Sequence, residues 1–258
     1  MSKKRAVKAI PLIGPGIIAL RRWWLKKDQT FEREELPKAD FLLPQARNLL
    51  SYTKFRTPAY SGQKFPAGYH TIQLCGQTIA GQRNPEKRLA MVPFDFAGKS
   101  VLDIGSNQGG MLHAMNGCLA WGVGVDYDPR LVNAATKVAR IRNDRTLSFY
   151  NFDLENDPLH LIEDLIPEKR ADVVFFLAMC NWVRNWPDVM QYLSTVSDHM
   201  LFEANGPKEL QQEQEALLRS LYWSVICYPQ LQRMTRVRNG DSFSGLLTSR
   251  DTASARCA

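Results

Sequence analysis

Histidine, paired cysteine and long apolar runs are all scarce in this 258-residue chain, and each shortage excludes a class of protein. There are four histidines and five cysteines, and no two cysteines stand in a C-x-x-C pair. The sequence therefore indicates neither a zinc site nor a disulfide framework, and we predict no metal. No run of about 18 apolar residues occurs, which argues against a transmembrane helix. Scattered single cysteines fit a reducing, cytoplasmic setting.

An excess of basic over acidic residues is also absent from most of the chain, although the net charge is +7. Residues 1–30 hold eight basic residues and one acidic residue, and the totals of 33 and 26 leave 25 of each sign for the rest. The excess therefore belongs to the first 30 residues alone. This distribution weakens a nucleic-acid interpretation of the remaining chain, which carries no net charge.

The most informative stretch runs from Val101 to Met115. Val101 to Ile104 form a short apolar run, which predicts a buried parallel strand. Gly105-Ser-Asn-Gln-Gly109 follows as a turn, and a helix is expected to begin at Gly110. A strand, a glycine turn and a helix in this order bring a ligand against bare backbone.

Three further strands are predicted after this unit, each with a polar residue at or just past its end. They are expected at 122–128, 147–153 and 171–179. Asp126 lies 21 residues beyond Gly105, the spacing that places a carboxylate on ribose hydroxyls in doubly wound sheets. Each acid taken alone could equally be a helix cap or a turn former.

The glycine turn resembles the first motif of class I S-adenosylmethionine-dependent methyltransferases. That motif has an acid two residues before its first glycine and a second glycine four residues on, here Asp103, Gly105 and Gly109. The nicotinamide fingerprint fits less well, because Asn107 occupies the position of its second glycine. The resemblance implies an α/β fold with a seven-stranded Rossmann-like sheet, helices on both faces and an N-terminal, mostly helical extension.

The resemblance also implies a set of site residues and S-adenosylmethionine as the cofactor. Asp126 is expected at the ribose, and Asp153 or its neighbour at the adenine. The full cofactor-binding prediction is Asp103, Gly105, Ser106, Asn107, Gly109, Asp126, Tyr127, Asp153, Leu154 and Ala178. Arg83, Arg88, Asn181 and Trp182 are predicted to bind the acceptor.

Two residues are predicted as general bases, His70 and Glu203. Related methyltransferases often carry an aromatic residue and a histidine in the loop after the fourth strand, where this chain has Trp182-Val183. That loop therefore supplies no histidine base. His70 could instead be a polar residue of a hairpin, and Glu203 could be the partner of an arginine.

We expect four regions: a basic, tryptophan-containing segment over 1–30, an extension or cap over 31–84, the methyltransferase domain over 85–250 and a tail over 251–258. Charged residues follow the apolar part of 1–30, which argues against a cleaved signal peptide. This segment could pack on the domain with its charges solvated. Its basic residues and tryptophans also suit contact with the inner face of an anionic membrane, and RNA is a weaker third interpretation.

Three functions remain open at this point. The first is an O-methyltransferase acting on a glycan, a lipid-linked sugar or another small molecule. The second is a methyltransferase of RNA, such as tRNA, which the neutral body of the chain makes a weaker candidate. The third is a non-catalytic module that binds S-adenosylmethionine. The sequence does not indicate an oligomeric state.

Overall fold

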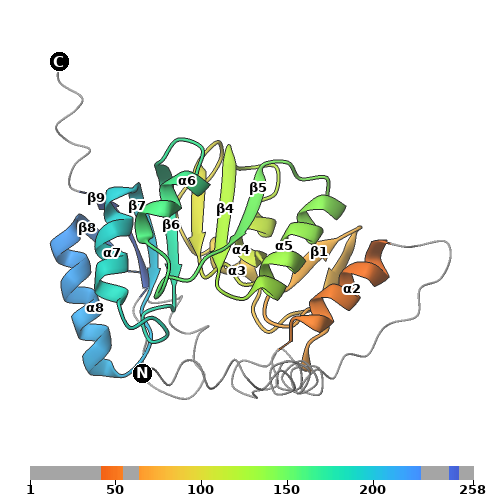
Figure 1. The fold of residues 1–258 in the computed structure, drawn as a ribbon, viewed down its shortest axis with the longest axis horizontal. Coiled ribbons are helices and arrows are strands. Elements are labelled where there is room, and N and C mark those ends of the chain that lie inside the picture. Colours follow the sequence, from red (N-terminus) through yellow and green to blue (C-terminus); the bar gives the residue numbers. More distant parts are fainter. Residues whose placement is uncertain (1–41, 55–63, 228–243, 250–258) are drawn as a thin grey trace, which may run out of the picture. The chain divides into compact units, whose positions relative to one another are not determined.

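The structure is a computed structural model that describes residues 42–54, 64–227 and 244–249 (Figure 1). The predicted segment 1–30 and the tail 251–258 lie outside the described residues. Within the described residues, no helix is both long enough and apolar enough to span a membrane.

A seven-stranded sheet forms the centre of the fold, in the order β5-β4-β3-β6-β7-β9-β8. Strands β3 to β7 run parallel, and β9 and β8 join at the edge in antiparallel orientation. The strands are β3 (Ser100–Ile104), β4 (Trp121–Asp126), β5 (Leu147–Asn151), β6 (Ala171–Leu177), β7 (Ser197–Glu203), β8 (Tyr222–Cys227) and β9 (Ser244–Ser249). The predicted α/β class and the Rossmann-like sheet are confirmed.

Parallel strands need crossover connections, and a helix lies in each connection from β3 to β7. These connecting helices are α4 (Gly110–Ala114), α5 (Pro129–Ile141), a 3-10 turn η3 (Leu159–Leu161) with α6 (Ile162–Leu165), and α7 (Trp186–Thr195). Helix α3 (Pro85–Leu89) precedes β3, and α8 (Lys208–Leu221) follows β7. Figure 1 shows α7 and α8 beside the end of the sheet that holds β7 and β8, and α5 at the end that holds β5.

Side chains of the central strands alternate between two hydrophobic layers, which explains why these strands are apolar throughout. In β6, Val173 and Phe175 join a cluster with residues of α4 and α5. Val174 and Phe176 join a second cluster with residues of α7 and α8. Because both faces are covered, the strand has no polar face, as is typical of parallel sheets.

The described part of the extension is one helix and one hairpin. The helix is α2 (Leu42–Tyr52), and in the hairpin β1 (Ile72–Leu74) pairs with β2 (Gln77–Ile79). Both pack against α5 through a third hydrophobic cluster that includes Val138. Cys75 and Gly76 form the hairpin turn, and both adopt the left-handed conformation that two-residue hairpin turns favour.

Candidate active site

The carboxyl ends of β3, β4 and β6 meet at one edge of the sheet. Ile104 of β3 lies opposite Val125 of β4 on one side and Phe176 of β6 on the other. This register brings Asp103, Gly105 and Asp126 together with the loop that follows β6. Ligands of open α/β sheets bind at this edge, so the sequence predictions converge on one place.

The turn after β3 has three residues in the left-handed region, with φ of 73° at Gly105, 54° at Asn107 and 71° at Gly109. A Cβ atom on Gly109 would lie 2.5 Å from the ring of Phe149. A Cβ atom on Gly105 would lie 2.3 Å from the sulfur of Met179. We expected the space at Gly105 to face the cofactor; instead the loop after β6 fills it, a contact that sequence spacing cannot reveal.

Asp126 connects the glycine turn to the end of β4. Its carboxylate accepts hydrogen bonds from the backbone N–H of Asn107 and of Asp128, both at 2.9 Å. Burial raises the pKa of Asp126 to about 6, against the lowering effect of these two hydrogen bonds. Asn151 of β5 supports the same strand end, since its amide donates to the carbonyls of Asp126 and Tyr127.

Asp103 lies under the turn and has an unsatisfied oxygen. Its side chain is buried, and within the described residues its Oδ2 accepts no hydrogen bond. Burial raises the pKa of Asp103 to about 7, although Arg88 opposes this rise and Asp126 adds to it. A buried acceptor without a partner marks a place where a ligand can donate.

The remaining predicted cofactor residues line the adjacent loops. The side chain of Ser106 is buried, that of Leu154 is buried after β5, and Tyr127 is 66% exposed just past β4. Asp153 uses its carboxylate within its own turn, where Asn156 and the N–H of Glu155 donate to it. The Asp153 carboxylate is therefore already engaged by its own loop.

The loop after β6 begins at Ala178, whose φ of 57° is left-handed for a residue with a Cβ atom. Such a conformation costs about 1–2 kcal/mol and must be held by its surroundings. The loop then presents Asn181 and Trp182, the latter 53% exposed. Both predicted acceptor residues on this loop thus lie at the surface beside the cofactor edge.

The far end of the same loop is attached to the loop after β5. The Asn185 amide donates to the carbonyl of Leu154 at 2.8 Å. Arg184 donates to Glu155 through its guanidinium and its backbone N–H. Arg184 and Asn185 belong to no sequence motif, so neither was predicted.

Arg88 and Glu203 form a buried ion pair across 115 positions of sequence. Their side chains are 10% and 7% exposed. Arg88 is therefore a buried residue rather than a surface one. The pair borders a small cavity with Val92, Met111, Leu177, Leu201 and Phe202. Glu203 is thus the partner of an arginine, which was the alternative to its prediction as a general base.

His70 is buried behind the glycine turn. A Cβ atom on Gly110 would lie 2.3 Å from its ring, and its backbone forms a bridge with Arg83. Burial, with the nearby cations Arg88 and Arg83, lowers the pKa of His70 to about 3. A neutral imidazole packed in this way is a weak proton acceptor, so the geometry does not favour His70 as a base.

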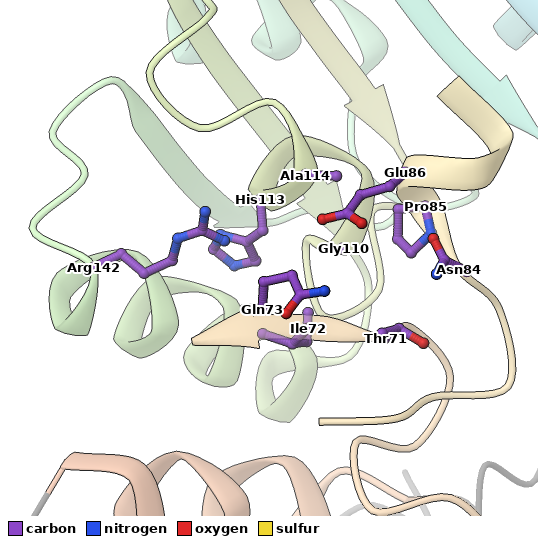
Figure 2. Close-up of a pocket in the computed structure, with 10 residues that line it drawn as sticks. All are labelled: Thr71, Ile72, Gln73, Asn84, Pro85, Glu86, Gly110, His113, Ala114 and Arg142. Atoms are coloured by element: carbon purple, nitrogen blue, oxygen red, sulfur yellow. The ribbon is translucent and has the colours of Figure 1, made fainter. Parts of the chain in front are cut away.

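A second small cavity lies behind α4, away from the edge just described. Figure 2 shows His113 of α4 and Arg142, just past α5, pointing into it, with Gln73 of β1 and Glu86 of α3 around them. Burial lowers the pKa of His113 to about 3, and Arg142 adds to the effect. His113 is therefore neutral and packs against Phe149.

The site fits S-adenosylmethionine in its polar groups and its backbone. It offers the backbone of the turn from Gly105 to Gly109, a carboxylate at the expected ribose position in Asp126, and an unpartnered buried oxygen on Asp103 for a donor. Among the described residues no group of three His, Cys, Asp or Glu side chains could hold a metal ion.

Comparison with known proteins supports this assignment. The family described as "Methyltransferase domain" matches residues 77–248, more than half of the chain. A search of the curated proteins finds no match.

Solved structures of similar fold include methyltransferases. The N-terminal domain of EvdMO1 with SAH bound has a TM-score of 0.54 and 11% identity, over 70% of this chain and 90% of that one. The same domain in the presence of SAH and D-fucose has a TM-score of 0.53 at 11% identity, with the same coverage. The bifunctional kinase-methyltransferase WbdD, in complex with a kinase inhibitor, has a TM-score of 0.50 at 14% identity, over 66% of this chain and 42% of that one. The chain belongs to the methyltransferase domain family and is a class I methyltransferase that uses S-adenosylmethionine.

Proposed function

We propose that this enzyme methylates an oxygen of a glycan, a lipid-linked sugar or another small molecule. The observation that carries the proposal is the pair Asn181 and Trp182, exposed beside the cofactor edge. An indole offers an apolar face with a polar edge, and an amide both donates and accepts hydrogen bonds. Together they suit a ring that has apolar C–H faces and hydroxyl edges, as sugars have.

Charge supports a small acceptor over RNA. Residues 31–258 carry 25 basic and 25 acidic residues, so the body of the protein lacks the positive excess that phosphate binding requires. The N-terminal domain of EvdMO1, which has a similar fold, was crystallised in the presence of SAH and D-fucose, which is a sugar. That structure supports the choice of acceptor class only by analogy of fold.

We propose that Asp126 holds the ribose, that the turn from Gly105 to Gly109 lies along the cofactor, and that Asp103 accepts a hydrogen bond from it. We also propose that Tyr127 and Leu154 border the adenine. When bound, S-adenosylmethionine supplies an activated methyl group. The protein's own task is to orient the acceptor and exclude water.

We assign Arg88 and Glu203 to the wall of the acceptor side. Their mutual ion pair satisfies both charges in a buried place, where an unpaired charge is costly. Glu203 remains the better-placed of the two proposed bases, because it ends β7 next to Leu177, the last residue of β6. His70 is assigned to packing against α4.

The test is methyl transfer from labelled S-adenosylmethionine into fractionated cell material. We expect label in the glycan or lipid fraction, unaffected by ribonuclease. Label that ribonuclease releases would favour an RNA acceptor, and no transfer to any fraction would favour a binding module. Trp182→Ala should raise the KM for the acceptor about tenfold and leave cofactor affinity unchanged, whereas Trp182→Phe should retain most activity.

A further inference from the structure

Helix α8 turns two glutamines toward the protein interior. Gln211 and Gln214 are 8% and 0% exposed, in positions where an amphipathic helix normally has apolar residues. Buried amides destabilise the folded state unless they are hydrogen-bonded, so both side chains are expected to have hydrogen-bond partners. Their partners lie outside the helix, in the segment that follows β7.

The two glutamines hydrogen-bond to the backbone of that segment. Gln214 donates to the carbonyl of Asn205 at 2.9 Å and accepts the N–H of Asn205 at 3.2 Å. Gln211 donates to the carbonyl of Gly206 at 2.8 Å. Both hydrogen-bonding groups of the Asn205 backbone are therefore satisfied by one side chain.

The Asn205 side chain extends this chain of hydrogen bonds to the loop after β6. Its Nδ2 donates to the carbonyl of Ala178 at 2.6 Å, and its Oδ1 accepts the N–H of Asn181 at 2.9 Å. One amide thus holds both ends of the reversal from Ala178 to Asn181. A Cβ atom on Gly206, next to it, would lie 2.7 Å from Cδ2 of Leu210 and 3.0 Å from Oδ1 of Asn181, so the segment packs closely against this loop.

This reversal decides what faces the glycine turn. Ala178 is left-handed, and the chain it redirects places Met179 directly over the Cα of Gly105. A shift of the loop would therefore change one wall of the cofactor site. The position of this wall is stabilised by consecutive hydrogen bonds that begin at Gln214 of α8 and pass through Asn205. Helix α8 lies on the opposite face of the sheet from α4.

We propose that Asn205, held by Gln214, is a positioning residue that places the loop 178–181 against the turn at Gly105. It acts through Ala178 and Met179 and touches no reacting atom. The inference depends on cofactor binding alone, so it stands whichever acceptor the enzyme uses.

The experiment compares S-adenosylmethionine with S-adenosylhomocysteine, which lacks the methyl group, by calorimetry on the full chain. Asn205→Ala should change the ratio of the two dissociation constants at least fivefold. It should also shift the carbon-13 resonance of the bound, labelled methyl group. Gln214→Ala should change both quantities in the same direction, by less.

Ser197→Ala is the matched control. Ser197 begins β7, the strand that Asn205 follows, and its hydroxyl donates a buried hydrogen bond to the Leu193 carbonyl. The substitution removes that hydrogen bond. It should lower thermal stability and leave the affinity ratio and the methyl resonance unchanged.

An unchanged ratio and methyl resonance in Asn205→Ala would overturn the proposal. Equal weakening of both ligands would overturn it as well, because a general structural defect does not discriminate between them. If Asn205→Ala does not fold, Asn205→Asp serves instead. It keeps an acceptor for the Asn181 N–H, removes the donor to Ala178 and is held to the same two outcomes.

Discussion

The backbone N–H of Asn107 donates to the Asp126 carboxylate at 2.9 Å, which connects the turn after β3 to the end of β4. One carboxylate therefore shapes the glycine turn and also stands at the proposed ribose position. The two roles can be separated by measuring affinity and stability in the same variants.

Asp126→Ala should weaken binding of S-adenosylmethionine by about 1–3 kcal/mol, because ribose hydroxyls and two backbone N–H groups lose their acceptor. Calorimetry measures the loss. Asp128→Ala is the control, since it removes the side chain that caps α5 and accepts the N–H of Arg130. It should cost about 1 kcal/mol of stability and leave affinity intact. Unchanged affinity in Asp126→Ala would remove this residue from the site.

Asp103→Asn should stabilise the protein in a pH-dependent way. The folded state holds the pKa of Asp103 at about 7, above the ordinary value of 3.8, so the native protein binds the extra proton between these values. Stability conferred by the neutral form is complete below about pH 4 and is lost as the pH rises to 7. The variant should therefore match the wild type at pH 4 and exceed it at pH 8.

One pKa unit corresponds to about 1.4 kcal/mol. The difference between 3.8 and about 7 therefore limits the gain in the free energy of unfolding at pH 8 to about 4 kcal/mol. Urea unfolding at the two pH values measures it. The same variant should bind S-adenosylmethionine more weakly, because a carboxylate is replaced by an amide. A gain of equal size at pH 4 and pH 8 would contradict the assigned pKa.

Glu203→Ala should destabilise the fold by about 3–5 kcal/mol, because it leaves the Arg88 guanidinium buried without its partner. Arg88→Met combined with Glu203→Leu should recover most of this loss, as apolar replacements fill the space. Asp198→Ala, which breaks the more exposed pair with Arg170, should cost about 1 kcal/mol or less. Methyl transfer by the folded double variant would exclude Glu203 as the base.

Residues 1–30 should attach the protein to anionic membranes. Each basic residue near such a surface contributes about 1 kcal/mol, and eight of them lie in this segment with Trp23 and Trp24. The full chain should sediment with phosphatidylglycerol vesicles at low salt and be released at roughly 0.5 M salt. Replacing the eight basic residues by glutamine should abolish sedimentation and preserve cofactor affinity.

Equal sedimentation of the two proteins would contradict membrane attachment. Binding of RNA with a steep salt dependence, and none to vesicles, would instead favour an RNA partner.

Local pattern in the sequence was enough to predict the elements at the site. The apolar run Val101–Ile104 and the glycines after it predict a strand, a turn and a helix from adjacent residues alone, and the structure has all three. Asp126 followed from the same logic, since parallel strands end at one edge. Element bounds were less exact: the strand predicted over 122–128 ends at Asp126, because Asp128 instead caps α5.

Only the tertiary structure decided which side chains meet. Three contacts at the site join residues that are distant in sequence: Arg88 with Glu203, Asn205 with Ala178, and Met179 with Gly105. Hydrophobic periodicity predicts which face of an element is buried, but not which side chains it meets. The burial of His70 likewise depends on how the hairpin packs against α4. The sequence thus determined the fold and the cofactor edge, because these follow from local spacing, whereas the walls of the site depend on contacts made across the sheet.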